Sequence, residues 1–129
     1  MNRAQTPQVP VSWGELVDKL TILDIKKARL TDPSAISNVS REHDYLSAVY
    51  SAIVDDSIVT ALRARLLDIN SQLWDVEDHI RDCEKAANFG PRFIELARSV
   101  YKLNDQRAAV KREINLHLKS GLIEEKSYH

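Results

Sequence analysis

A stripe of apolar residues between positions 59 and 87 restricts the fold of this chain more than any other feature. Its members follow one another at spacings of three and four residues: Val59, Leu62, Leu66, Ile69, Leu73, Val76, Ile80, Cys83 and Ala87. This spacing is typical of the seam of a coiled coil, where one side of a helix meets a partner helix. A helix of about 30 residues is on the order of 45 Å long, so its partner must be long as well.

The segment after this stripe supplies such a partner. Gly90 and Pro91 predict a stop and a restart, with the glycine just past one helix and the proline in the first turn of the next. The seam then continues as Phe93, Leu96, Val100, Leu103, Arg107, Val110 and Ile114. Because the connection is short, we expect the two helices to fold back as an antiparallel hairpin.

Arg107 is the one charged residue in this second seam. Burial of an unpaired charge would cost the fold a large part of its stability. We therefore predict that Arg107 is paired, either with Asp68 or through Gln72 and Asn70 on the preceding helix. An Arg107 side chain pointing freely into solvent would mean that the register assigned to the fourth helix is wrong.

Two shorter helices precede the hairpin. Ser12 and Glu15 form a capping-box pattern, which marks the start of the first helix. Ile22 and Ile25 lie off the main apolar stripe of that helix, which predicts that it is covered on two sides. The two predicted helices span about residues 13–30 and 36–54.

The composition favours one all-helical domain. The 129 residues include only three glycines and four prolines, which sheet and loop proteins need in larger numbers as turn residues. We predict an all-α fold, a four-helix antiparallel bundle with a long coiled-coil-like hairpin formed by helices 3 and 4. Residues 1–11 should form a flexible N-terminal arm, and residues 12–129 a single helical domain with a C-terminal tail at 122–129.

Charge and cysteine content argue against several classes of partner. The net charge is −1 and the pI is about 6.4, which gives no reason to expect a nucleic acid or an anionic membrane. The single cysteine, Cys83, cannot form an intramolecular disulfide, so a reducing compartment suits the chain. We expect no secretion signal and no membrane span, because no stretch is apolar enough for either. These features predict a cytoplasmic protein.

Polar side chains beside the two seams form the candidate ligand-binding site. They are Trp74, Glu77, Asp78 and Arg81 on the third helix, and Arg98, Tyr101 and Asp105 on the fourth. A hairpin that turns near residue 90 places Arg81 level with Arg98. Two interpretations follow: an ion-pair lattice on a solvated bundle, or a polar pocket in which both arginines hold an anionic small molecule. In a pocket, Arg98→Ala should weaken ligand binding far more than it weakens the fold.

Other residues are weaker candidates for chemistry. Four charged residues along the first helix are interpreted as surface groups: Glu15, Asp18, Lys19 and Lys26. Glu15 and Lys19, four residues apart, would form a favourable ion pair. A Mg²⁺ site would combine Glu15 and Asp18 with Asp75, Asp78 and Asp82, a spacing that is common by chance. His79 and Cys83 could both contact zinc, but two further ligands are missing. We therefore expect neither a metal nor a cofactor, and we find no Ser-His-Asp arrangement or nucleotide motif.

Several segments of the chain are recognisable as a set. They are Pro10 to Leu16, Asp18-Lys19 with Thr21 to Leu23, Leu73 to Asp78 with Ile80-Arg81, Leu96 to Tyr101 with Asn104-Asp105 and Arg107-Ala108, and the ending Glu124-Glu125-Lys126-Ser127-Tyr128. Together they resemble a bacterial family of uncharacterised short domains, over about residues 9–128. That family has no known activity, and the resemblance implies a setting among genes for glycosyltransferases and surface polysaccharides. The terminal motif predicts that the tail docks back, over the pocket or onto a partner chain.

We expect a non-catalytic binding or assembly module, a homodimer or higher homo-oligomer in a bacterial surface-carbohydrate pathway. Assembly is predicted because Ile22, Ile25, Trp74 and the two seams offer more apolar surface than four such helices can bury. The alternative is a small all-α enzyme acting on a phosphorylated or sugar-nucleotide substrate. Its site would contain Glu77, Asp78, Arg81, Arg98 and Tyr101. An ordered anion or metal between helices 3 and 4 would favour the enzyme interpretation. A dry lattice of paired charges would favour the binding or assembly module.

Overall fold

The fold is all-α, as the sequence predicts. The computed structural model describes residues 5–119, and within that range it contains four α-helices, one short 3-10 helix and no strand. The elements are α1 (Trp13–Arg29), α2 (Pro33–Tyr50), η1 (Ser51–Ile53), α3 (Ser57–Lys85) and α4 (Pro91–His117). The predicted tail at 122–129 and its docking lie outside the described residues. Of the described helices, none is both long enough and apolar enough to cross a membrane.

Short polar side chains fix the starts of the first three helices. The Ser12 hydroxyl accepts a hydrogen bond from the Glu15 amide at 3.1 Å, which is half of the predicted capping box. Asp32 accepts from the Ala35 amide at 2.9 Å and Pro33 occupies the first turn, so α2 begins three residues earlier than predicted. Asp56 caps α3 in the same way, with two amide hydrogen bonds at 3.0 Å.

The loop between α3 and α4 differs from the prediction in one respect. Ala87, and not a glycine, takes the left-handed conformation just after α3, with φ at 52°. The Asn88 amide there donates to the Cys83 carbonyl at 2.8 Å, which satisfies a carbonyl at the end of the helix. Gly90 is instead the N-cap residue of α4, with φ at −80°, and Pro91 opens that helix as expected.

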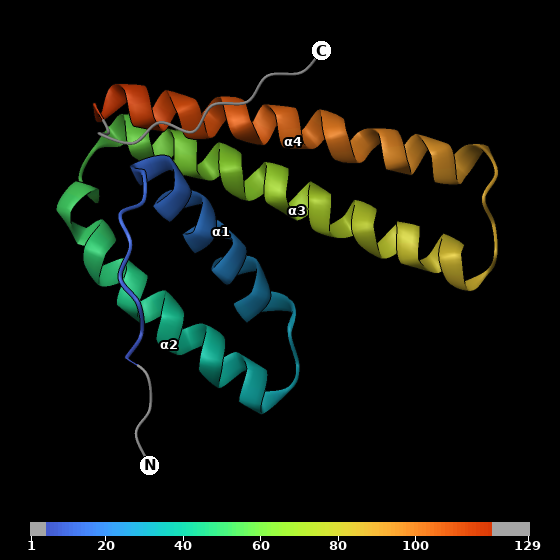
Figure 1. Cartoon of the computed structure of the whole chain (residues 1–129), viewed down its shortest axis with the longest axis horizontal. Coiled ribbons are helices and arrows are strands. Elements are labelled where there is room, and N and C mark those ends of the chain that lie inside the picture. Colours follow the sequence, from blue (N-terminus) through green and yellow to red (C-terminus); the bar gives the residue numbers. More distant parts are fainter. Residues whose placement is uncertain (1–4, 120–129) are drawn as a thin grey trace.

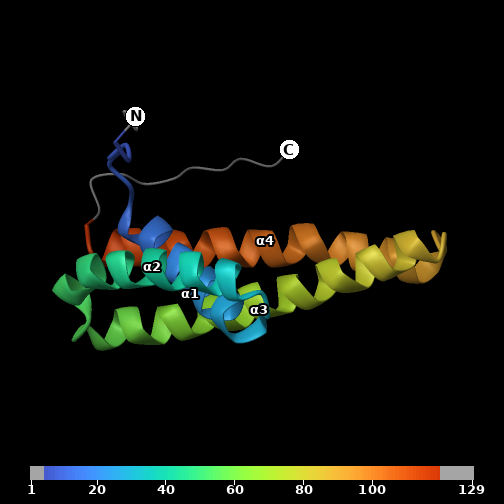
Figure 2. The ribbon, with the colours of Figure 1, turned by 90° about the horizontal axis from the view of Figure 1, so that it is seen from below.

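The four helices form two antiparallel hairpins of unequal length. α3 and α4 run side by side, as predicted, and the α1–α2 hairpin crosses them near one end (Figures 1 and 2). α1 passes obliquely from the C-terminal half of α4, where it contacts Asn115, to the middle of α3, where Arg29 pairs with Asp75. We call residues 76–102, which extend beyond this last contact, the projecting hairpin, and the rest of the described chain the base.

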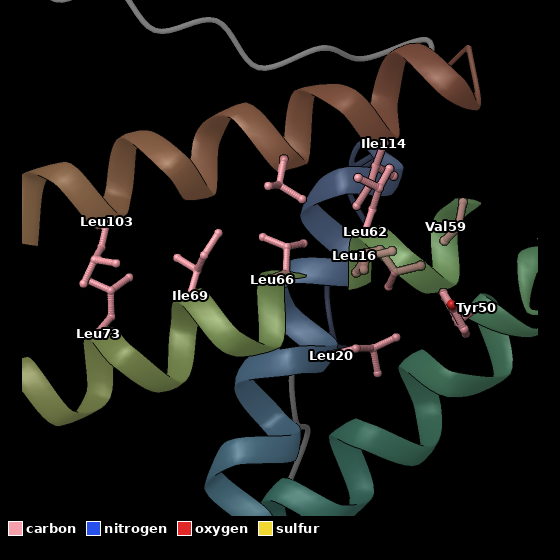
Figure 3. Packing of buried hydrophobic residues seen from close by; sticks show 12 residues of the cluster. Leu16, Leu20, Tyr50, Val59, Leu62, Leu66, Ile69, Leu73, Leu103 and Ile114 are labelled. Carbon is pink, nitrogen blue, oxygen red and sulfur yellow. The ribbon is translucent and has the colours of Figure 1, made fainter. Parts of the chain in front are cut away.

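The main hydrophobic core lies in the base. It is built from α1, α3 and α4, with Tyr50 of α2 closing one side (Figure 3). Its buried members are Leu16, Val17, Leu20, Tyr50, Val59, Leu62, Leu66, Ile69, Leu73, Leu103, Val110 and Ile114. Ile25 is buried and Ile22 half-buried, which confirms that α1 is covered on two sides.

The projecting hairpin has only the seam between its own two helices. Cys83 and Leu96 are buried there, while Val76, Ile80 and Val100 stay half-buried because no third described helix covers them. Near the turn, the rings of Phe89 and Phe93 pack edge to face at 5.3 Å between centroids. The same seam pattern therefore gives a closed core in the base and a two-helix contact beyond it.

Candidate functional site

Most residues of the site predicted from sequence are exposed on the surface of the hairpin formed by α3 and α4. Arg81, with 69% of its side chain exposed, pairs with Asp78 of its own helix at 3.6 Å. Glu77, Arg98, Tyr101 and Asp105 are also exposed, and no hydrogen bond or ion pair joins them to another described side chain. The structure therefore places these residues on the hairpin as expected, but only Arg81 and Asp78 among them are linked.

Trp74 lies apart from this group, at the junction with the base. The guanidinium of Arg29 sits 5.8 Å from the centroid of its indole ring and also pairs with Asp75. Trp74 is thus half-buried and partly covered by α1. In the described part of the chain, no three His, Cys, Asp or Glu side chains come close enough together to hold a metal ion.

A row of polar contacts between α1 and α4, which we call the polar ladder, is the most buried polar feature of the base. Its α4 members are Arg107, Lys111 and Asn115, four residues apart and so on one face. The Gly14 amide donates to Asn115 Oδ1 at 2.7 Å, and Lys111 Nζ donates to Glu15 Oε2 at 2.7 Å. Arg107 completes the ladder through both oxygens of Asp18, which is 1% exposed.

Asp18 is the centre of this network. Arg107 Nε donates to Asp18 Oδ1 at 2.8 Å, and Asn70 Nδ2 donates at 2.9 Å both to that oxygen and to Thr21 Oγ1. Thr21 in turn donates to the Asp18 carbonyl at 2.7 Å. Every polar group of Asp18 thus finds a partner inside the protein, which is the condition for burying a carboxylate at acceptable cost.

Three predictions about charged residues change here. Arg107 is paired, as predicted, but its carboxylate is Asp18 of α1 and not Asp68, which instead accepts from Gln72 at 2.9 Å. The interpretation of Asp18 as a surface charge is wrong, because α1 turns that side of itself onto α3 and α4. The expected Glu15–Lys19 pair is also replaced, since Glu15 reaches Lys111 and Lys19 reaches Glu42 at 3.0 Å.

Gly14 allows the close approach of α1 to α4. A Cβ at this position would stand 2.4 Å from the Lys111 carbonyl oxygen and 2.9 Å from Asn115 Oδ1. Asn115 is 1% exposed, and its Nδ2 has no hydrogen-bond partner among the described residues. A signal for the ladder does exist in the sequence: Gly14, Asp18 and Thr21 share one helical face of small or polar side chains.

A second polar cluster joins α1, α2 and α3. His43 Nε2 lies 2.7 Å from Asp24 Oδ1, and Ser47 Oγ lies 3.3 Å from His43 Nδ1. Arg63 of α3 donates to the other oxygen of Asp24 at 3.0 Å, with its guanidinium 4.7 Å from the centroid of the Tyr50 ring. The sequence-based conclusion that no Ser-His-Asp arrangement exists is therefore wrong.

A third contact joins the start of α3 to the end of α4, at the open end of the long hairpin. His117, in the last turn of α4, lies 2.8 Å from Asp56 Oδ2, while Asp56 Oδ1 caps α3. Hydrogen bonds from the Val59 amide and from His117 lower the pKa of the Asp56 carboxyl below its ordinary value. This cluster lies at the end of the base opposite the projecting hairpin (Figure 1).

Comparison with known proteins identifies the family of the chain. Residues 7–129 match the family described as Family of unknown function (DUF6165), which agrees with the resemblance to an uncharacterised short-domain family. No curated protein matches the chain, and no solved structure matches it either.

Proposed function

We propose that this chain, which belongs to the Family of unknown function (DUF6165), is a non-catalytic binding or assembly module that works through the projecting hairpin. The observation that carries the proposal is the position of that hairpin, which extends past α1 and α2 with no third described helix on it (Figures 1 and 2). Two helices alone leave part of their apolar surface open to water. A surface of this kind is suited to a partner helix.

Apolar side chains are exposed along this hairpin. Phe89, Ile94 and Tyr101 are 52%, 56% and 51% exposed, and the last two are seven residues apart, so they lie on one face of α4. Aromatic residues and isoleucine contribute to binding by burying large apolar areas. Ile22 and Ile25, from which assembly was predicted, are covered by the chain itself, so the case for assembly now rests on the projecting hairpin.

Charge favours a second copy of the chain as the partner. The α3 side of the hairpin carries four acidic groups against two basic ones: Glu77, Asp78, Asp82 and Glu84 against Arg81 and Lys85. The α4 side carries three basic groups against one acidic: Arg92, Arg98 and Lys102 against Glu95. A twofold arrangement that sets α3 of one copy against α4 of the other brings opposite charges together at both contacts.

Light scattering on the full chain tests this assembly. At tens of micromolar, the wild type should have the mass of a dimer or a larger oligomer, with an interface above about 1,000 Å². The double variant Ile94→Glu/Tyr101→Glu should be monomeric. The matched control Tyr45→Glu/Val49→Glu changes two exposed side chains of α2 and should keep the wild-type mass. A monomeric wild type rejects assembly. If the control variant is monomeric while the Ile94→Glu/Tyr101→Glu variant keeps the wild-type mass, this interface is rejected.

Arg98 supports a second role for the same surface, the binding of an anionic small molecule such as a sugar nucleotide. It is exposed, and no carboxylate pairs with it in the described part of the chain. Arg92, which pairs with Glu95 at 3.8 Å, is the matched control. Arg98→Ala should abolish a thermal shift induced by sugar nucleotides while Arg92→Ala keeps it. If sugar nucleotides give the wild type no shift, this role is excluded and the assembly role stands.

A further inference from the structure

The Ser47–His43–Asp24 chain is a hydrogen-bonded group that neither the projecting hairpin nor the polar ladder uses. The geometry points to Ser47 as a base-activated hydroxyl, a modification site that accepts an acyl group from an activated ester. This inference does not depend on assembly, because the cluster lies in the base, where α2 meets α1 and α3.

Asp24 fixes which nitrogen of His43 carries the proton. An ionised carboxylate can only accept hydrogen bonds, so Nε2, at 2.7 Å from Asp24 Oδ1, must be the donor. A neutral imidazole protonated at Nε2 has its lone pair on Nδ1. That lone pair faces Ser47 Oγ at 3.3 Å, where it accepts the hydroxyl proton. These are the three roles of an activated serine: a nucleophile, a base, and a group that orients the base.

The spacing of four residues between His43 and Ser47 on α2 makes this arrangement local and well defined. Side chains at i and i+4 lie on one helical face, so the hydroxyl and the imidazole need no loop to bring them together. His43 is 17% exposed, while Ser47 is half-buried, so a small ester can reach the hydroxyl although the base is shielded. Asp24 is held from its other side by Arg63, which stops the carboxylate from turning away.

Arg63 also supplies the positive charge of the cluster. Its guanidinium has five N–H groups, and one nitrogen donates to Asp24 Oδ2. With Asp24 Oδ2 held by Arg63, Asp24 Oδ1 remains directed at His43 Nε2.

The chemical step transfers the acyl group and conserves protons. Ser47 Oγ attacks the carbonyl carbon of the ester, and its proton passes to His43 Nδ1. The bond from that carbon to the leaving oxygen then breaks, and the departing oxygen takes the proton from His43. The products are acylated Ser47, an alcohol or phenol, and neutral His43.

Mass spectrometry with p-nitrophenyl acetate as the probe tests this site. Peptide mapping of the intact, folded chain should find acetylated Ser47. His43→Gln should slow its formation by about 100-fold, the typical contribution of a general base. Ser51 and Ser99, whose hydroxyls donate to backbone carbonyls without an imidazole, are internal controls.

Asp24→Asn separates this chemistry from a purely structural role. The asparagine oxygen can still accept from Arg63, but its NH₂ group then faces Nε2 and moves the imidazole proton to Nδ1, where it can no longer act as a base. Acetylation of Ser47 should fall at least tenfold while circular dichroism shows an unchanged helix content. Acetylation of Ser47 no faster than that of Ser51 and Ser99, or unaffected by His43→Gln, overturns the proposal.

Discussion

The base and the projecting hairpin share one seam pattern but differ in what lies across it. In the base, α1 covers the seam, and Leu66 and Val110 are fully buried together with the carboxylate of Asp18. In the projecting hairpin, Val76 and Val100 hold equivalent seam positions and remain half-buried. A periodic apolar stripe thus specifies that two helices meet, whereas a third helix decides whether their contact becomes a core.

Charges show the same difference. The Asp18 carboxylate of the Asp18–Arg107 pair is buried and also bonded to Asn70, so losing either member of the pair breaks a buried hydrogen-bond network. The Asp78–Arg81 pair has more than half of each side chain exposed, and water and salt weaken it. The contribution of a charge to stability should therefore depend on its region and not on its type.

The largest effect is expected for Asp18→Ala. It removes the carboxylate that accepts from Arg107 and Asn70, so it should lower the free energy of unfolding by about 3 kcal/mol in urea titrations. Asp78→Ala, the matched variant of the projecting hairpin, should cost less than about 0.5 kcal/mol. Equal losses for the two variants would show that burial by α1 does not distinguish the regions.

Gly14→Ala should have the next largest effect. Alanine favours a helix over glycine by up to about 1 kcal/mol, so an exposed helical glycine would gain from the change. Here the new Cβ would stand 2.4 Å from the Lys111 carbonyl, and overpacking should outweigh that gain with a net loss of about 2 kcal/mol. Thermal unfolding followed by circular dichroism measures it.

Gly90→Ala is the control for that variant. At the N-cap of α4, the new Cβ would meet only Asn88 Oδ1 at 3.5 Å, an ordinary contact. Its loss should stay below about 1 kcal/mol, the usual range for an N-cap change. A stabilised Gly14→Ala variant would contradict the close approach of α1 to α4.

The sequence predicts the elements of this fold better than their contacts. Helix periodicity is a local property, so the two seams and the antiparallel hairpin follow from spacing alone. The need of Arg107 for a partner also follows, because it interrupts an apolar stripe. Its actual partner, Asp18, does not, because 88 residues separate the two in the chain and the crossing of α1 over the hairpin brings them together.

The candidate sites show the same limit. The polar face of Arg81 and Arg98 is predicted from helical spacing, and both residues are exposed in the structure. The Ser47–His43 pair could have been found from its i to i+4 spacing, but Asp24 comes from α1 and Arg63 from α3. Only the packing of three helices makes these residues one cluster, and no local pattern carries that information.

The smallest effect concerns Asp56, at the end of the base farthest from the projecting hairpin. Its pKa is lowered from the ordinary value of 3.8 by hydrogen bonds from the Val59 amide and His117. A group with a lowered folded-state pKa adds stability that is complete above the unfolded-state pKa and lost as the pH falls through the folded-state pKa. Asn caps helices about as well as Asp, so Asp56→Asn removes this ionisation and keeps the cap.

Urea midpoints of wild type and Asp56→Asn should therefore differ slightly at neutral pH, with the wild type more stable. The difference should shrink between about pH 5 and about pH 3, as the wild-type carboxylate becomes protonated. Arg81→Ala, in the exposed ion pair of the projecting hairpin, is the control. Its urea midpoint should differ from that of the wild type too little for a pH dependence to be measured. A gap between wild type and Asp56→Asn that stays constant with pH would mean that Asp56 acts only as a cap. The contact with His117 would then contribute nothing, and the two ends of the long hairpin would be held together by the apolar core alone.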